Sequence, residues 1–252
     1  MEATEIAALL LGTCVWGTLL YSPDSPLARL NLWRGSKAAL MGAVIAMNTL
    51  LIIRSPFGRR SGAHFNPAVT LTFFWLGRIH RWDAVCYIAA HFAGGIGGVL
   101  IARQILGTHL SSPPVRYIVT VPGIHGSPIA FLYEFLSAAF LMGTVLYASN
   151  HRRLAHLTPV LVALLIMFNY SLSSSIAGFS VNPARTFSSA LFAWIWQGIW
   201  IYFTAPSLGM LMSAVIYVRA FGSNRVYCAK VFHDLRSTCP FACRFERVYQ
   251  ET

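Results

Sequence analysis

Charged residues are scarce in this sequence, and their scarcity excludes a soluble fold. Asp, Glu, Lys and Arg make up 11% of the 252 residues, whereas 56% are hydrophobic. An ordinary soluble domain has about 25% charged residues. Several apolar runs reach about 20 residues, the length that crosses roughly 30 Å of hydrocarbon. We therefore predict an integral membrane protein with one membrane domain.

Acidic residues are the scarcest charged residues, with eight Asp and Glu against nineteen Lys and Arg and a formal net charge of +11. A basic balance can indicate nucleic-acid binding, but in a membrane protein cationic loops hold the cytoplasmic side and contact anionic lipid. We expect the lipid bilayer as a partner and no nucleic acid. The N-terminus carries Glu2 and Glu5 and no basic segment. Its first apolar run is therefore predicted to be a span and not a cleaved signal peptide.

The sequence also lacks a secreted disulfide framework and any recognisable catalytic arrangement. Cys14 and Cys86 lie in or beside apolar segments, where a free Cys behaves as a small hydrophobe. We find no nucleophile–base pattern and no nucleotide-binding loop, so we predict that the protein is not an enzyme.

One short phrase is present twice. The triplet Asn-Pro-Ala occurs as Asn66, Pro67 and Ala68 and again as Asn182, Pro183 and Ala184. An Asn followed by Pro favours the start of a helix, because the Asn side chain caps free N–H groups and Pro loses no hydrogen bond at the first helical position. About three turns of apolar residues follow each triplet, which is half the length of a bilayer span.

The apolar segments repeat in the same order on both sides of the middle of the chain. The expected spans are residues 6–21, 36–53, 84–106, 128–149, 157–172 and 199–218. Three spans per half, with a half-helix between the second and third, predict two halves that lie upside down relative to each other. We expect a channel domain over residues 1–220, with halves at about 1–110 and 125–220, and a basic Cys/His tail over 221–252. Glycines 94, 95, 97 and 98 are predicted to let the third span approach its neighbours closely.

Basic residues predict the orientation. The loops on the side of the termini contain Arg54, Arg59, Arg60, Arg78, Arg81, Arg152 and Arg153, and the tail adds six more Lys and Arg, whereas the opposite side has mainly Arg29, Arg34, Lys37 and Arg116. Both termini are therefore expected in the cytoplasm, with the protein in the cytoplasmic (inner) or plasma membrane.

Two half-helices that enter from opposite faces could meet at the middle of the membrane, with their positive N-terminal ends facing each other. If Asn66 and Asn182 each direct an amide N–H into a pore, a passing water must accept from both. This interrupts a proton wire while the helix dipoles oppose cations. Two ordinary helix caps are the alternative interpretation.

The segment Ser61–Thr70, the segment Asn182–Arg185 and the order of the spans resemble the aquaporin (major intrinsic protein) family. The resemblance extends to Glu134 in the fourth span and to residues 202–206 with Gly209 in the sixth. It implies an all-α membrane fold of six transmembrane helices and two re-entrant half-helices. It also implies a passive pore in each protomer of a homotetramer, with no cofactor required.

Arg185 is a candidate selectivity residue, because a charge inside the bilayer is costly and indicates function. The resemblance implies that it forms a narrow filter with Phe179, Tyr170 and, by counting from the first triplet, Ala46. Met47 or Ala43 is possible at the last position. An Arg that only bonds carbonyls is the structural alternative.

Three further residues are expected to line the pore or support its loops. They are His64, Glu134 and His91. Glu134 should bond the backbone before a half-helix, and it is expected to be the only acidic residue deep in a span, which makes an ion-coupled transporter the weaker interpretation. The family usually has a Glu where this chain has Leu9 in the first span, so the support of the first half is not identified.

The predicted function is a passive water channel. Thr186 stands where related glycerol channels carry Asp, and this resembles the water-selective branch, from a bacterial source. A broader channel for glycerol, ammonia or hydrogen peroxide is the alternative, and a non-conducting membrane scaffold is an alternative of another class.

The tail contains a possible metal site. Its ligands would be Cys228, His233, Cys239 and Cys243, and three thiols with an imidazole match a structural zinc site by ligand type. Free thiols in a lipid-facing basic tail are the alternative.

Overall fold

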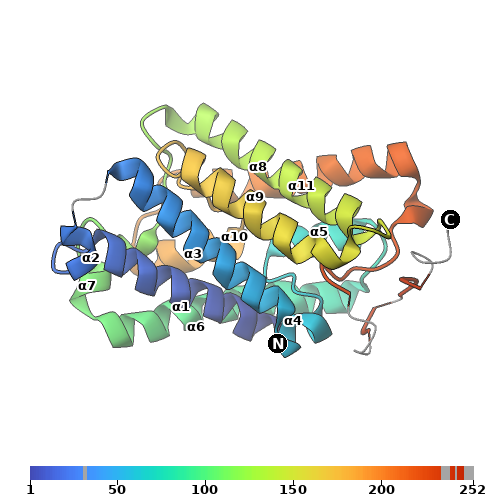
Figure 1. Ribbon diagram of the computed structural model, residues 1–252, viewed down its shortest axis with the longest axis horizontal. Helices are drawn as coiled ribbons and strands as arrows, with labels where there is room; N and C mark the ends of the chain where they lie inside the picture. Colours follow the sequence, from blue (N-terminus) through green and yellow to red (C-terminus); the bar gives the residue numbers. More distant parts are fainter. Residues whose placement is uncertain (31–32, 234–238, 242, 247–252) are drawn as a thin grey trace.

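The computed structural model describes residues 1–252 except 31–32, 234–238, 242 and 247–252. Six of the described helices are long and apolar enough to cross a membrane, which confirms the predicted number of spans. They are α1 (Glu2–Tyr21), α3 (Arg34–Arg54), α6 (Arg81–Leu106), α8 (Gly126–Ser149), α9 (Thr158–Ser173) and α11 (Ile199–Phe221). They lie roughly along the long axis of the molecule (Figure 1). The described residues contain no strand.

Two shorter helices start at the repeated triplets. They are α5 (Pro67–Trp75) and α10 (Pro183–Ala193), with nine and eleven residues. At 1.5 Å per residue they rise about 14 and 17 Å, half a bilayer. Both pack against α6 and α11, inside the bundle. The remaining helices are single turns or short connectors: α2 (Pro26–Arg29), α4 (Pro56–Ser61), α7 (Thr108–Ser111), η1 (Arg116–Ile118), η2 (Ala155–Leu157) and η3 (Ser223–Arg225).

Glycine brings paired helices into backbone contact. In the first half α1 packs on α6, in the second half α8 packs on α11, and α3 against α9 joins the halves. A Cβ atom added to Gly98 would lie 2.5 Å from the Ala7 carbonyl oxygen of α1. Gly209 of α11 meets the Phe135 carbonyl of α8 in the same way. The predicted close approach of the third span is therefore confirmed at Gly98, whereas Gly97 faces open space.

The first helix begins earlier than its apolar run. It starts at Glu2, not at residue 6, and it buries both carboxylates, with 3% of Glu2 and 2% of Glu5 exposed. The expectation that Glu134 is the only acidic residue deep in a span is therefore wrong. The hydrophobic pattern did not predict this first turn of α1, because the hydrogen-bond partners that allow the two carboxylates to be buried lie about 60 residues away in the sequence.

The N-terminus and the tail lie at the same end of the bundle (Figure 1), which we call the tail end. The described tail residues fold back onto it. The Asn150 side-chain oxygen, after α8, accepts a hydrogen bond from the backbone N–H of Tyr227 (2.8 Å). Arg78, after α5, donates to the Ser223 carbonyl (2.7 Å). The tail is therefore attached to two of the connections at this end.

Candidate functional site: a pore between two half-helices

The segments that precede the two triplets have the same unusual backbone. Positive φ angles occur four, three and one residues before each Asn: at Gly62, Ala63 and Phe65 and at Gly178, Phe179 and Val181. Left-handed conformations are rare for residues other than Gly and persist where surrounding contacts hold them. The repeat in the sequence is thus a repeat in backbone geometry.

A buried carboxylate holds each of these segments. Glu134 of α8 accepts from the backbone N–H groups of Ser180 and Val181, both at 2.7 Å. Glu2 of α1 accepts from the N–H groups of His64 (3.1 Å) and Phe65 (2.6 Å). Glu2 is therefore the support of the first half, in place of the family position occupied by Leu9. The signal for it in the sequence is a pair of carboxylates at the head of an apolar run.

Further side chains complete the support of the first segment. His91 Nε2 donates to Glu2 (2.8 Å), and the Ser61 hydroxyl donates to Glu5 (2.6 Å). His64 Nε2 donates to the Ala229 carbonyl of the tail (2.7 Å), so in its neutral form Nδ1 accepts from the Thr70 hydroxyl (2.9 Å). The structure thus places His91 in the loop support, and it places His64 between the first half-helix and the tail.

The two Asn side chains cap their own helices and tie them together. Asn66 Oδ1 accepts from the N–H of Ala68 (2.9 Å), and Asn182 Oδ1 accepts from those of Ala184 (3.1 Å) and Arg185 (3.2 Å). Asn66 Nδ2 donates across to the Val181 carbonyl (2.7 Å), and Asn182 Nδ2 donates to the Phe65 carbonyl (2.8 Å). One N–H of each amide is therefore committed to joining the helix starts, and Pro67 and Pro183 hold the first helical positions.

Arg185 lies in the first turn of α10 and is 7% exposed. Its Nη1 is buried and has no hydrogen-bond partner among the described residues. The rings of Tyr170 and Phe179 meet edge to face, 6.0 Å apart, and Phe179 lines the same cavity as Arg185. From α3, that cavity is lined by Ile45 and Thr49, whereas Ala46 is buried in the neighbouring core. The wall expected at Ala46 is thus formed by its neighbour Ile45.

Two small cavities adjoin each other, and a larger hollow shares no lining residue with them. An outer hollow of about 530 Å³ lies beside Tyr170, the Arg185 cavity measures about 70 Å³, and an inner cavity measures about 50 Å³. The two smaller cavities share Thr49, Phe65, Asn66, Leu141 and Ile166. A water molecule occupies about 30 Å³ of liquid volume, so each of the two small cavities is large enough to hold at least one water molecule. The residues that line the inner cavity include Val231 of the tail.

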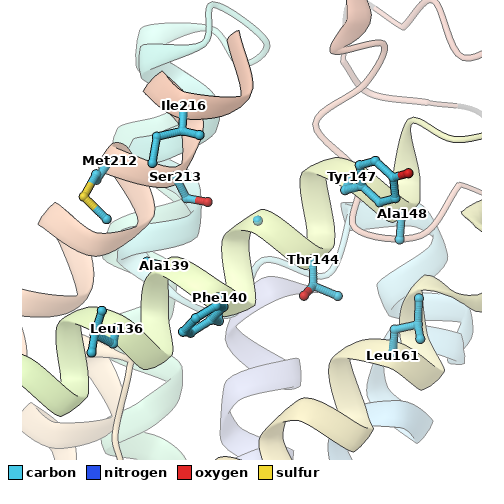
Figure 2. A pocket seen from close by; sticks show the side chains of 11 residues that line it. Leu136, Ala139, Phe140, Thr144, Tyr147, Ala148, Leu161, Met212, Ser213 and Ile216 are labelled. Carbon is cyan, nitrogen blue, oxygen red and sulfur yellow. The ribbon is translucent and has the colours of Figure 1, made fainter. Parts of the chain in front are cut away.

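A separate groove of about 420 Å³ lies on the outer face between α8 and α11 (Figure 2). Its walls include exposed apolar side chains such as Phe140 and Ile216. It shares no lining residue with the two narrow cavities. Exposed apolar surface on membrane-length helices is suited to lipid or to another subunit, so we do not assign this groove to the pore.

The predicted metal ligands come together in the tail. The ligand atoms of Cys228, His233, Cys239 and Cys243 all lie within 4.8 Å of one another. The Sγ atoms of Cys228 and Cys239 are 3.4 Å apart, and His233 Nε2 is 3.0 Å from the Sγ of Cys243. The hydrogen bond from Cys228 lowers the pKa of the Cys239 thiol to about 4, and the same contact raises the pKa of Cys228.

Comparison with known proteins agrees with this geometry. The family model for the Major intrinsic protein matches residues 7–217. The probable aquaporin NIP7-1 of Arabidopsis thaliana is 27% identical over 214 residues, which are 84% of this chain and 74% of the relative. Aquaporin NIP1-3 of Oryza sativa subsp. japonica is 30% identical over 218 residues, with 85% and 73% covered.

A solved structure has the same fold. The X-ray structure of the aquaglyceroporin from Plasmodium falciparum superposes with a TM-score of 0.67 and covers 89% of this chain and 96% of that chain, at 15% identity. At this identity the likeness concerns the fold alone. The two sequence relatives are plant proteins of the NIP type, so they lend no support to a bacterial source.

Proposed function

The chain belongs to the major intrinsic protein (aquaporin) family, and from that premise we propose that it is a passive channel for water and other small uncharged polar solutes, including glycerol. Aquaporin-family proteins are channels and not enzymes. The observation that carries the proposal is the buried Nη1 of Arg185, which lies beside a narrow cavity and has no hydrogen-bond partner among the described residues. A buried donor without a partner is costly, and a passing hydroxyl group or water would satisfy it.

The middle of the path offers donors of the same kind. An Asn amide has two N–H donors, and one of each pair ties the half-helices together. The second N–H of Asn66 and of Asn182 is then available to a solute. Both half-helices point their positive ends toward this position, and the residues described as lining the two narrow cavities include no carboxylate. This arrangement opposes cations and interrupts proton transfer while neutral molecules pass.

Selectivity for water alone stays a prediction, and a broader channel has more support. The Arg185 cavity mixes apolar walls, such as Ile45 and Ile166, with polar groups such as Thr49 and Asn182. A polyol presents both hydroxyl groups and CH groups, so this lining can contact it with polar groups and with apolar groups at the same time. The NIP-type relatives and the aquaglyceroporin fold are compatible with this range of solutes.

The assembly and location follow the family expectation. We propose a homotetramer with a pore in each protomer, in the cytoplasmic or plasma membrane, with the tail end in the cytoplasm. The basic residues of the tail end support the orientation. The exposed apolar groove between α8 and α11 (Figure 2) is suited to lipid or to a neighbouring protomer.

Osmotic flux in proteoliposomes without divalent metal tests the function. We expect fast shrinkage in an impermeant osmolyte and a slower recovery of volume in glycerol, both above empty vesicles. Arg185→Val should raise the glycerol-to-water ratio and increase proton leak about tenfold or more, because the buried cation is lost. Arg103→Val is the matched control, since Arg103 is exposed on α6, and it should behave as the parent protein.

Other outcomes would change the conclusion. Glycerol recovery at the rate of empty vesicles, beside fast water flux, would leave a water-selective channel. If folded protein without metal conducted neither solute, the channel would be refuted in favour of a membrane scaffold.

A further inference from the structure

The four side chains Cys228, His233, Cys239 and Cys243 have the composition and spacing of a closed metal site. In tetrahedral zinc sites the metal lies about 2.3 Å from sulfur and 2.0–2.1 Å from nitrogen, so neighbouring ligand atoms lie roughly 3.5–3.8 Å apart. The four ligand atoms here lie within 4.8 Å of one another, and small side-chain movements bring them to that spacing. Their ligand type selects a soft or borderline ion such as zinc over calcium or magnesium, which prefer oxygen.

Neighbouring groups are suited to bound thiolates. The three cysteines are free and not joined in a disulfide. The backbone N–H of Phe245 points to the Sγ of Cys243 (3.4 Å), and this kind of contact steadies a charged sulfur. The ring of His233 stacks on Phe245 with centroids 4.2 Å apart, which fixes the imidazole plane. The Nδ1 of His233 is buried and has no hydrogen-bond partner among the described residues.

The segment that follows the first ligand lies on the loop before α5. The N–H of Val231 donates to the Gly62 carbonyl (2.9 Å), the Ala229 carbonyl accepts from His64 Nε2 (2.7 Å), and Lys230 donates to the Arg59 carbonyl. Residues 229–231 lie between the ligands Cys228 and His233 in the sequence. A metal bound by these ligands would therefore hold this segment in place.

A second contact comes from between the other two ligands. The ring of Phe241 stacks on His64, with centroids 5.8 Å apart and planes 6° from parallel. A Cβ added to Gly62 would lie 2.9 Å from the Phe241 ring. Phe241 lies between Cys239 and Cys243 in the sequence, so the same metal would hold it too.

Val231 connects the tail to the pore. Its side chain is 4% exposed and lines the inner cavity together with Asn66, His64 and Ile53. The inner end of the path is therefore walled by a residue of the tail, not only by the helices of the channel. Removal of this segment would widen the path at that end.

We propose that Cys228, His233, Cys239 and Cys243 bind one zinc ion, and that the zinc-bound tail closes the inner mouth of the pore with Val231. The proposed metal site depends only on residues of the tail, whereas the proposed closure rests on the proposed channel function. Zinc favours the closed arrangement because its ligands come together only when the tail is folded. Loss of zinc allows residues 229–231 and Phe241 to leave the loop before α5. By the same linkage, the protein binds zinc more weakly when its pore is open.

Zinc content of the purified full-length protein tests the site independently of transport. We expect about one zinc per chain, released by a thiol reagent, and cobalt substitution should give the absorption of a tetrahedral thiolate site. The double variant Cys239→Ser/Cys243→Ser should lose the ion, whereas the control Cys86→Ser, on the outer face of α6, should keep it. If the parent protein held no more zinc than the double variant, the site would be refuted.

Stopped-flow flux in proteoliposomes tests the closure, with EDTA or zinc on both sides of the membrane. EDTA should raise water permeability at least about fivefold, and zinc should reverse the effect. Val231→Gly should conduct faster in zinc while it still binds the ion, which separates closure from metal binding. Full zinc occupancy with permeability unchanged by EDTA and by Val231→Gly would refute the closure. If water and glycerol also crossed no faster than in empty vesicles, the channel function would fail as well, while the metal analysis would still decide the site.

Discussion

Glu2 and Glu134 perform equivalent tasks in the two halves, and each task needs a carboxylate. Both side chains accept from two consecutive backbone N–H groups in the segment before a half-helix. A carboxylate has only acceptors, so it can satisfy two neighbouring donors at once. The left-handed residues in these segments persist because the buried carboxylates and the helix caps hold the chain on both sides of them.

Glu2→Gln therefore has a specific expected cost. The side-chain amide of the Glu2→Gln variant would be a donor where the carboxylate accepts. The backbone N–H of either His64 or Phe65 would therefore face another N–H group and lose its hydrogen-bond acceptor. A buried unpaired group costs about 1–3 kcal/mol. We expect a lower melting temperature in detergent and a lower solute flux, with Glu134→Gln showing the same pattern. Thermal unfolding and proteoliposome flux measure the two effects.

Glu5→Gln is the matched control, because it makes the same change one turn later in α1. The Oε1 of Glu5 accepts from Ser61, and its Oε2 is buried without a partner among the described residues. An amide can keep the Ser61 bond, so we expect a smaller loss. Equal losses for the two variants would show that burial, and not support of the loop, determines the role of Glu2.

The helix positions of the candidate site residues could be predicted from sequence where the signal is local. Asn66, Asn182 and Arg185 belong to compact motifs, and each has the helix position that the motif implies. The role of Glu2 was not predicted, because it depends on contacts with residues 62 and 63 positions away in the sequence. Ala46 and Ile45 differ by one residue along α3, and only the rotation of the packed helix distinguishes the cavity wall from the core.

At the scale of elements, small residues let helices of each half pack backbone to backbone. Two consecutive glycines of α6 differ sharply in surroundings: a Cβ on Gly98 would meet the Ala7 carbonyl, whereas a Cβ on Gly97 meets nothing within 4 Å. The apolar runs predicted the helices because hydrocarbon demands apolar side chains and satisfied backbones. They could not predict the pairing, which depends on which face of α6 meets α1.

These two glycines give a matched pair of variants. Gly98→Ala should force α1 and α6 apart and destabilise the protein by about 1–3 kcal/mol, as overpacking does. Gly97→Ala adds the same methyl group without a clash, and it should be neutral or stabilise by up to about 1 kcal/mol, because Ala is the better helix former. Thermal unfolding of both variants in one detergent compares them. A loss in Gly97→Ala as large as that in Gly98→Ala would contradict contact between α1 and α6 at this point.

At the scale of the whole molecule, charge divides the two ends of the bundle. Described basic residues at the tail end include Arg54, Arg59, Arg60, Arg78, Arg81, Arg152, Arg153, Arg219, Arg225, Lys230 and Arg244, whereas the other end has Arg29, Lys37, Arg103 and Arg116. Basic loops remain in the cytoplasm. The tail end should therefore lie where cellular thiols are kept reduced, so the four zinc ligands would be available for metal.

Labelling of single introduced cysteines tests this orientation in intact cells. His125 and Arg152 are both exposed, at opposite ends of α8. An impermeant maleimide should label His125→Cys in intact cells, and it should label Arg152→Cys only after the cells are permeabilised. The parent protein measures the background from Cys86, its exposed native cysteine. The reverse pattern would place the tail outside the cell. The proposed closure would then respond to external zinc, and the pore would close from the outside.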